Sequence, residues 1–223
     1  MPEKRISFHG HSSFDSLGTS IYSAESPTVF LLSPANLSGP RAKLLFRESS
    51  QIDLVQRLRR SQATIGEVFT FVSGLYFRGK LTYATRFANP PKGLSGVRII
   101  TSASGLLHPD VLVTLDWLRA TSDSVIDPNN PAYRDSLISD AQALCGLLSS
   151  ATRIVLLGSI ATPKYVVPLL EIFGSRLFFP SDFVGRGDMS RGSLLLRSAR
   201  QDVQLAYTTV ATAILSTRGR SPK

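Results

Sequence analysis

The chain has 223 residues, of which 43% are hydrophobic and 18% charged, a composition typical of a folded domain rather than a disordered chain. This length suffices for one sizeable hydrophobic core, so a single domain is expected. The formal net charge of +9 favours a polyanionic partner, of which nucleic acid is the commonest kind. A basic surface that serves only solubility is the alternative.

Composition also excludes several classes of protein. There is one cysteine, Cys145, so no internal disulfide can form. The chain has three histidines and shows no Cys/His spacing typical of zinc, and we expect neither a metal nor a cofactor. No apolar run approaches the roughly 18 residues of a membrane span, and the first residues lack the apolar core of a signal peptide. We therefore expect a cytoplasmic protein that does not bind membranes.

Three segments are expected along the chain. Residues 1–26 are polar and rich in Ser and Gly, which predicts a mobile N-terminal segment; His9 and His11 lie in it. Residues 27–215 carry the apolar patterns of one domain. Residues 216–223 form a basic C-terminal tail.

In the first half of the domain, the apolar run at residues 28–33 predicts a buried strand. Residues 41–60 alternate apolar and basic side chains at helical spacing, with six basic and two acidic residues, a net charge of +4. This pattern predicts a helical region with one basic face. Residues 65–75 read as a helix or strand that breaks at Ser73 and Gly74. Aromatic and basic residues interleave over residues 76–87, and the stretch at residues 73–80 is interpreted as a functional loop.

The second half alternates helical and strand patterns. The expected strands lie at residues 97–101, 153–157 and 177–179, the expected helices at 133–149 and 164–173, and residues 111–118 are compatible with either. Residues 193–197 and 203–210 read as two strands that could pair. The order helix, strand, Gly turn, helix, strand predicts an α/β fold with a central mixed sheet flanked by helices, whose loops converge at one end of the sheet. An α+β arrangement remains open.

The stretch GRGDMSRG at residues 185–192 is the first candidate site. A Gly-rich turn exposes backbone N–H groups, and Arg186 and Arg191 add forked cationic donors, a combination that suits phosphate or carboxylate. Gly187 and Ser190 would line this site, and Asp188 could orient an arginine. The alternative is a tight turn with solvated arginines, and the phosphate-loop motifs GK[ST] and GxGxxG are absent.

The second candidate follows the predicted strand at residues 153–157. Gly158 and Ser159 come directly after that strand, and Lys164 lies where the next helix begins. In open α/β sheets, ligands bind beyond the carboxyl ends of the strands, and a helix N-terminus offers free N–H groups to an anion. An ordinary helix N-cap is the alternative interpretation.

Two further loops carry polar or aromatic residues. Ser102, Ser104, His108 and Asp110 form a possible Ser/His/Asp set around Gly105, although the GxSxG motif is absent and a polar pocket loop is the favoured interpretation.

The other loop holds Tyr76 beside Arg78 and Lys80, which suits base stacking next to phosphate contacts. The alternative is that its aromatic residues belong to the core.

Taken in order, four stretches resemble the YaaA family of peroxide-stress proteins. They are LLSPAN at residues 31–36, GLYFRG at 74–79, SASGLLHPD at 102–110 and GRGDMSR at 185–191, the last being the most specific. Asn36 stands where the family has a lysine, and the third stretch lacks the family's Tyr and Arg. The resemblance implies a mixed α/β single domain, DNA binding and a link to oxidative stress, without a known catalytic reaction.

These patterns predict a nucleic-acid-binding protein with a basic, arginine-lined cleft that recognises damaged or distorted DNA, rather than RNA, in a stress response. The expected phosphate-binding residues are Arg41, Arg78, Lys80, Lys164, Arg186 and Arg191. The expected pocket residues are Ser33, Tyr76, Ser102, Ser104, Gly105, Gly158, Ser159, Gly187 and Ser190. The alternative is an enzyme that cleaves a glycosidic bond or modifies a base of a nucleotide in the same cleft, with Tyr76, Asp110 and Asp188 as candidate catalytic residues. The sequence does not predict an oligomeric state.

Overall fold

A six-stranded sheet in the order β4-β3-β1-β6-β7-β8 forms the centre of the molecule in the computed structural model, which describes residues 26–213. Its strands are β1 (Thr28–Leu32), β3 (Val97–Ile100), β4 (Leu106–Leu107), β6 (Arg153–Leu157), β7 (Leu177–Pro180) and β8 (Tyr207–Thr209). The four inner strands run parallel, while the edge strands β4 and β8 run antiparallel to their neighbours. A small antiparallel pair joins β2 (Ala63–Thr64) to β5 (Leu112–Val113).

The central strands are buried along their whole length. Every residue of β1 and β6 is buried, and the two strands pair in register from Thr28 opposite Arg153 to Leu32 opposite Leu157. A parallel strand covered by helices on both faces needs apolar side chains on both faces, which explains the near-continuous apolar runs TVFLL and RIVLL.

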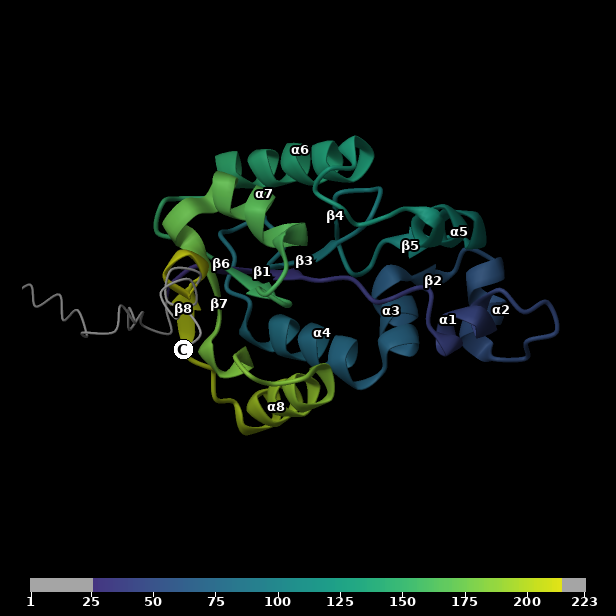
Figure 1. Ribbon diagram of the computed structural model, residues 1–223. Helices are drawn as coiled ribbons and strands as arrows, with labels where there is room; N and C mark the ends of the chain where they lie inside the picture. The colour runs from purple at the N-terminus through teal and green to yellow at the C-terminus, as the bar shows by residue number, and fades with distance from the viewer. Residues whose placement is uncertain (1–25, 214–223) are drawn as a thin grey trace, which may run out of the picture.

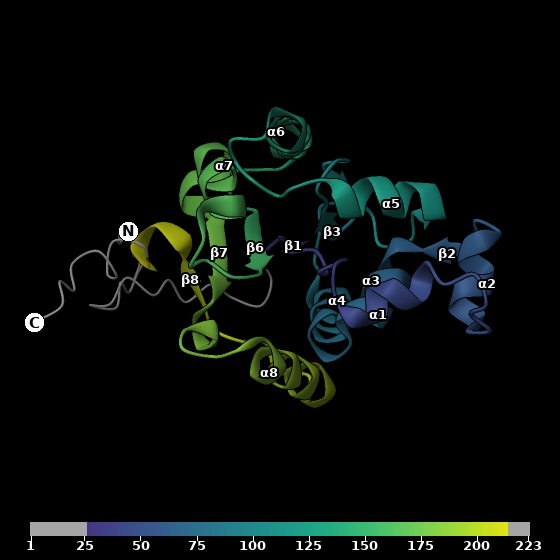
Figure 2. The same ribbon diagram turned by 45° about the vertical axis from the view of Figure 1, so that its right-hand side comes forward.

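Helices cover both faces of the sheet. Helices α6 (Pro131–Leu147) and α7 (Pro163–Phe173) lie on one face, and α4 (Leu75–Phe87) and α8 (Asp188–Gln201) on the other (Figure 1). The remaining helices, with the small sheet, lie beyond the carboxyl ends of the parallel strands (Figure 2): α1 (Pro40–Leu45), α2 (Asp53–Arg59), α3 (Ile65–Ser73) and α5 (Leu115–Asp123). Two 3-10 turns, η1 (Gly174–Arg176) and η2 (Ser181–Phe183), flank β7.

The strand order reverses direction between β1 and β6. From β1 the chain passes to β3 on one side, whereas β6 lies on the other side of β1 and leads on to β7. In open α/β sheets, the loops that leave two such strands diverge, and a crevice opens between their carboxyl ends. The residues that follow Leu32 and Leu157 therefore flank the position where this class of sheet binds its ligands.

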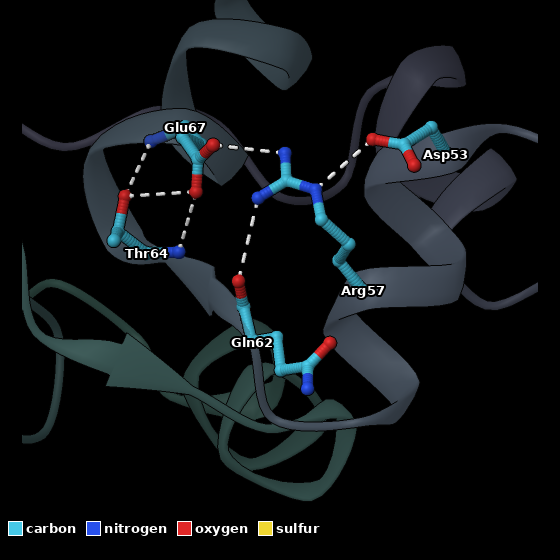
Figure 3. A network of polar contacts seen from close by, with 5 residues as sticks. All are labelled: Asp53, Arg57, Gln62, Thr64 and Glu67. Carbon is cyan, nitrogen blue, oxygen red and sulfur yellow. Dashed lines mark hydrogen bonds and ion pairs between the residues drawn. The ribbon is translucent and has the colours of Figure 1, made fainter.

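A network of polar side chains connects helices α2 and α3 beyond the sheet (Figure 3). The Arg57 guanidinium contacts the Glu67 carboxylate at 2.8 Å and the Asp53 carboxylate at 3.0 Å, and it donates to the Gln62 carbonyl at 3.3 Å. Thr64 and Glu67 form a capping box at the start of α3. The hydrogen bond from Arg57 is the main reason that the pKa of Glu67 lies below its ordinary value. The network thus joins α2 to the first turn of α3.

The structure confirms the α/β fold with a mixed, mostly parallel sheet and flanking helices, and it corrects three local predictions. The stretch at residues 73–80 is not a loop but the end of α3 and the start of α4, because Tyr76, Phe77 and Lys80 are buried at helical spacing. Residues 193–197 lie in α8 and are not a strand; β8, within 203–210, pairs with β7. The helical region at 41–60 is interrupted between α1 and α2.

The N-terminal segment predicted at residues 1–26, apart from Ser26, and the basic tail at 216–223 lie outside the described residues, as do His9 and His11. Within residues 26–213, no helix combines the length and the apolar character that crossing a membrane requires. The same residues contain no cluster of three or more His, Cys, Asp or Glu side chains placed to hold a metal ion.

Candidate functional site at the carboxyl edge of the sheet

Glycines from two of the sequence motifs bring α4 and α8 into backbone contact. A Cβ on Gly79 would lie 2.7 Å from the carbonyl oxygen of Gly192, and a Cβ on Gly192 would lie 2.8 Å from the carbonyl oxygen of Leu75. Real side chains do not fit at such distances, so both positions require glycine. Residues 188–192 of the stretch GRGDMSRG therefore begin a closely packed helix, and residues 185–187 form the exposed segment before it. The crossing sets the first turns of α8 beside the first turns of α4.

Lys80 lies in the core at the end of β1. Its side chain is buried, with 1% of the residue exposed, and its Nζ donates to the Ser33 carbonyl at 2.5 Å and to Ser33 Oγ at 2.9 Å. The Nζ also lies 4.6 Å from the centre of the Tyr76 ring and 4.9 Å from that of Phe77. The Ser33 hydroxyl in turn donates to the Leu157 carbonyl of β6 at 3.2 Å. Lys80 therefore fixes Ser33, the residue that follows β1 and contacts the end of β6, at the point where the strand order reverses.

The ammonium form of Lys80 is disfavoured at this position. Burial lowers the pKa of Lys80 to about 7, and the negative charge of Asp188 opposes only part of that change. No carboxylate among the described residues lies within ion-pair distance of the amine. A neutral amine has two N–H bonds, which matches the two acceptors offered by Ser33.

Tyr76 presents a buried hydroxyl next to this amine. Only 7% of Tyr76 is exposed, and its hydroxyl has no hydrogen-bond partner of acceptable geometry among the described residues. Burial raises the pKa of Tyr76 to about 12, while the nearby Arg191 guanidinium acts in the opposite direction. Burial is also the main reason that the pKa of Tyr165 is raised, and the negative charge of Asp188 adds to the rise at both tyrosines. The same carboxylate thus influences two tyrosines and Lys80.

The two arginines of the GRGDMSRG stretch have different surroundings. Arg191 is 15% exposed, donates through Nε and Nη2 to the Phe183 carbonyl, and lies over the Phe183 ring at 5.3 Å. Its Nη1 is 3.7 Å from the Asp188 carboxylate. Arg186 is exposed and donates to Ser190 Oγ at 3.2 Å. Arg191 therefore orients the start of α8 at the site, whereas Arg186 faces solvent together with Gly187 and Ser190.

A pocket of about 430 Å³ opens beside this cluster, beyond the ends of β1 and β3; we call it the carboxyl-edge pocket. Pro34, the residue after Ser33, lines this pocket. Tyr165 and Lys164 from the first turn of α7 form part of its wall. Its walls are rich in hydroxyl groups, and its lining includes no acidic residue. The residues that line it are Pro34, Ala35, Asn36, Leu37, Ser38, Phe69, Ser102, Thr121, Ser122, Ser124, Ile126, Lys164 and Tyr165.

The Ser/His/Asp set considered from sequence does not come together. Ser102 lines the carboxyl-edge pocket and donates to the Thr121 carbonyl at 2.8 Å. His108 and Asp110 line a separate pocket of about 570 Å³ on the other side of α3. Ser104 Oγ accepts a hydrogen bond from the Trp117 indole at 3.1 Å. These residues therefore serve different parts of the structure.

Two of the three glycines that were expected in the pocket, Gly105 and Gly158, have packing roles, whereas a Cβ on Gly187 would meet nothing within 4 Å. Gly105 adopts a positive φ of 59°, and a Cβ there would collide with the Asp140 carboxylate. A Cβ on Gly158 would lie 2.9 Å from Ser33 Cβ, so glycine lets β6 end close against β1. Ser159, which follows, accepts a hydrogen bond from the Ala161 N–H at 3.3 Å. Gly158 thus belongs to the strand junction that Lys80 also holds.

The basic residues expected to bind phosphate fall into three groups. Lys80 is buried and offers no amine to solvent, and Arg191 is held by Phe183. Lys164 and Arg186 are exposed near the carboxyl edge.

The remaining two, Arg41 and Arg78, line a depression of about 340 Å³ at the junction of α3 and α4. The basic face expected at residues 41–60 is partly used internally, because Arg57 forms ion pairs and Arg59 donates to the carbonyls of Arg47 and Glu48.

Sequence reasoning missed the pocket wall formed by Thr121, Ser122 and Ser124 at the end of α5. No local motif marks these residues, which reach the site only through the packing of α5 beyond the sheet. The pairing of Gly79 with Gly192 was also missed, since these residues are far apart in the chain. Tyr165 could have been found from the sequence, because it lies in the first turn of α7, the helix that follows β6.

Together these features define an α/β protein with helices on both faces of a mostly parallel sheet and a pocket at the carboxyl edge of its central strands. Compared with models of protein families, with curated proteins and with solved structures, the chain matches none. The four-motif likeness to the YaaA family therefore stays an expectation from sequence.

Proposed function

We propose that this protein is an enzyme that acts on a nucleotide or a nucleobase in the carboxyl-edge pocket, with Lys80 and Tyr76 as its proton-transferring groups. The observation that carries the proposal is the burial of Lys80, without a carboxylate partner among the described residues, at the end of β1. Burying an unpaired amine costs stability, and groups with strongly shifted pKa values cluster at functional sites. A purely structural role could be filled by a neutral donor.

The pocket suits a nucleotide in size and in chemistry. Its volume of about 430 Å³ lies in the range of small-molecule sites. Tyr165 offers an aromatic face to a base, and the hydroxyl groups at the pocket walls can bind a sugar or base edge. Lys164 supplies the positive charge, with no acidic residue in the lining to oppose a phosphate. The net charge of +9 favours the approach of such an anion.

The two buried groups match the needs of acid–base chemistry. A Lys80 amine with a pKa of about 7 can accept a proton near neutral pH. Tyr76, whose pKa is about 12, stays protonated there and can donate a proton to a leaving group. Cleavage of a glycosidic bond can use one group that accepts a proton from the attacking water and another that protonates the departing base. Lys80 and Tyr76 lie behind the pocket and not in its lining, so the proposal requires that ligand binding opens a contact to them past Ser33. Arg191 and Asp188 would position Tyr76; Arg191 lowers the pKa of its hydroxyl, and Asp188 raises it.

The direct test is incubation with a panel of nucleotides and damaged DNA oligonucleotides, followed by chromatography for a released or altered base. Lys80→Met preserves the length of the side chain and removes the amine, so turnover should fall by at least a hundredfold while the protein stays folded. Ser139→Ala, an exposed change on α6, serves as the matched control. Turnover that survives Lys80→Met would overturn the proposed role of Lys80.

A second candidate function, the recognition of damaged or distorted DNA in the cytoplasm during a stress response, is favoured by four exposed basic residues. Arg41, Arg78, Lys164 and Arg186 are exposed, and none forms an ion pair with another described residue. The resemblance to the YaaA family implies the same activity. Phosphate contacts would make the affinity fall steeply with salt. Gel-shift titrations at several salt concentrations test this candidate, and absent or salt-insensitive binding would count against it.

A further inference from the structure

A second hollow lies next to the carboxyl-edge pocket and carries a different chemistry. We call it the arginine depression; Arg41, Thr70, Phe71, Gly74, Leu75 and Arg78 line it. Ser38 and Phe69 line the carboxyl-edge pocket, while Arg41 and Thr70, close to them in the chain, line the depression. No residue lines both hollows, but neighbouring residues at the start of α1 and in α3 contribute to each of them.

We propose that the arginine depression is a binding site for a phosphate group of the same ligand whose nucleotide unit occupies the carboxyl-edge pocket. The proposal rests on the proposed nucleotide site and specifies its substrate class, a nucleotide that carries a further phosphate or continues into a strand. Two arginines line this hollow, and its lining contains no acidic side chain. Like charges held together repel each other, and a bound phosphate relieves that repulsion.

The backbone at the α3–α4 junction is shaped to admit the Arg41 guanidinium. Gly74 has φ 59° and ψ −121°, a conformation that favours glycine, and a Cβ there would lie 2.5 Å from Arg41 Nη1. The same Nη1 donates to the Phe71 carbonyl at 3.4 Å. That contact holds one edge of the guanidinium and leaves its other N–H groups for a ligand. Forked donors of this kind match the geometry of phosphate oxygens.

A comparison within the molecule separates this pair from structural arginines. Arg57 is neutralised by two carboxylates, Asp53 and Glu67, and Arg119 is paired with Asp116. Arg41 and Arg78, although they line one hollow, have no carboxylate partner within the described chain. The Thr70 hydroxyl adds a further donor to the same hollow. The depression thus has the donors and the charge of an anion site.

The test measures the affinity of the full chain for four probes: inorganic phosphate, adenosine 5′-monophosphate, adenosine 3′,5′-bisphosphate and a fluorescent oligothymidylate of six nucleotides. Wild type is compared with Arg41→Ala/Arg78→Ala. Lys92→Ala/Arg200→Ala is the control, because it removes two exposed positive charges elsewhere on the surface. All three proteins should show the same circular dichroism spectrum and a similar melting temperature, since all four side chains are exposed.

We expect the bisphosphate or the oligonucleotide to bind wild type at least tenfold more tightly than the monophosphate. The Arg41/Arg78 variant should lose that gain, and it should keep its affinity for the monophosphate within twofold. A gain for the bisphosphate identifies a free nucleotide as the source of the phosphate, and a gain for the oligonucleotide alone identifies a strand. For a strand, the slope of log affinity against log salt should also become shallower by about one.

Two results would overturn the site. The first is an equal loss of affinity for the bisphosphate and the oligonucleotide in the Arg41/Arg78 variant and in the Lys92/Arg200 control. The second is that wild type binds the bisphosphate and the oligonucleotide no more tightly than the monophosphate. These failures are separable from failure of the enzyme proposal. A bisphosphate that is bound and turned over equally by wild type and the Arg41/Arg78 variant refutes the phosphate site alone. Arginine-dependent binding of a probe, with no base released or altered in the turnover panel, supports the site and counts against the enzyme.

Discussion

Gly79 on α4 lies directly against the backbone of Gly192 on α8, so that a Cβ added to Gly79 would be 2.7 Å from the Gly192 carbonyl oxygen. This contact joins the stretches GLYFRGK and GRGDMSRG, which are more than a hundred residues apart in the sequence. It brings the first turns of α8, with Asp188, beside Lys80. The geometry of the candidate site therefore depends on the absence of two side chains.

Substitution of either glycine by alanine should disturb both stability and the site. Because the nearest atoms at Gly79 are backbone atoms that cannot move independently, we expect Gly79→Ala to lower the free energy of unfolding by about 1–3 kcal/mol. Urea denaturation measures the change. Gly146→Ala on α6 is the matched control, since nothing lies within 4 Å of the added methyl group there, and it should stabilise by up to about 1 kcal/mol. Equal effects at the two positions would contradict the close crossing.

Lys80 should make stability depend on pH above neutrality. Below pH 7 the amine is protonated in the folded and unfolded states, and the folded state bears the full cost of a buried charge. Between about pH 7 and the ordinary lysine pKa, only the unfolded state binds the proton, so stability should rise with pH by at most about 1.4 kcal/mol per unit. Urea denaturation at pH 6, 7, 8 and 9 should show this rise in wild type relative to Lys80→Met. A difference that does not change with pH would contradict the burial of a protonatable amine.

Tyr76→Phe should separate catalysis from stability. The Tyr76 hydroxyl is buried and has no hydrogen-bond partner among the described residues, so its removal should leave the free energy of unfolding unchanged or raise it by roughly 1–2 kcal/mol. If the hydroxyl donates a proton to substrate, turnover should nevertheless fall by at least tenfold. The two readouts are thermal denaturation and the rate of base release. A variant that is clearly destabilised would show that the hydroxyl has a structural partner.

The network of Figure 3 should stabilise α3 through both its cap and its ion pair. Thr64→Ala removes the N-cap and should cost roughly 1 kcal/mol. A double-mutant cycle between Arg57 and Glu67 should show favourable coupling. Because the pKa of Glu67 is lowered in the folded state, the coupling should be present above the ordinary pKa of a glutamate. It should disappear as the pH falls through the lowered value, and coupling that persists below it would contradict this account.

The parts of the fold that could be predicted from sequence are those with strong local patterns. The runs TVFLL and RIVLL are apolar after their first residue because both faces of the central sheet are covered, and each was predicted as a strand. The alternation of strands and helices in the second half was enough to predict an α/β fold. The predicted turn at Gly158 and Ser159 does follow β6 at the carboxyl edge of the sheet.

Helices α4 and α8 were not predicted from the sequence, because contacts with residues far away in the chain stabilise them. Their glycines and charges suggested loops, because glycine weakens an isolated helix and a lysine normally faces water. Only contact with a distant helix makes Gly79 and Gly192 favourable, and only the end of β1 provides the acceptors that bury Lys80. The same limit applies to Arg191, which was expected in an anion site but is held by the Phe183 carbonyl.

The central claim is that Lys80 carries an amine that loses its proton near neutral pH. Its most direct test is an NMR titration of protein labelled with carbon-13 at lysine Cε, with the Lys80 signal assigned by its absence in Lys80→Met. The account predicts that this signal titrates with a pKa of about 7, while the exposed lysines titrate near their ordinary value. A Lys80 signal that titrates together with the exposed lysines, at roughly 10.4, would contradict the account.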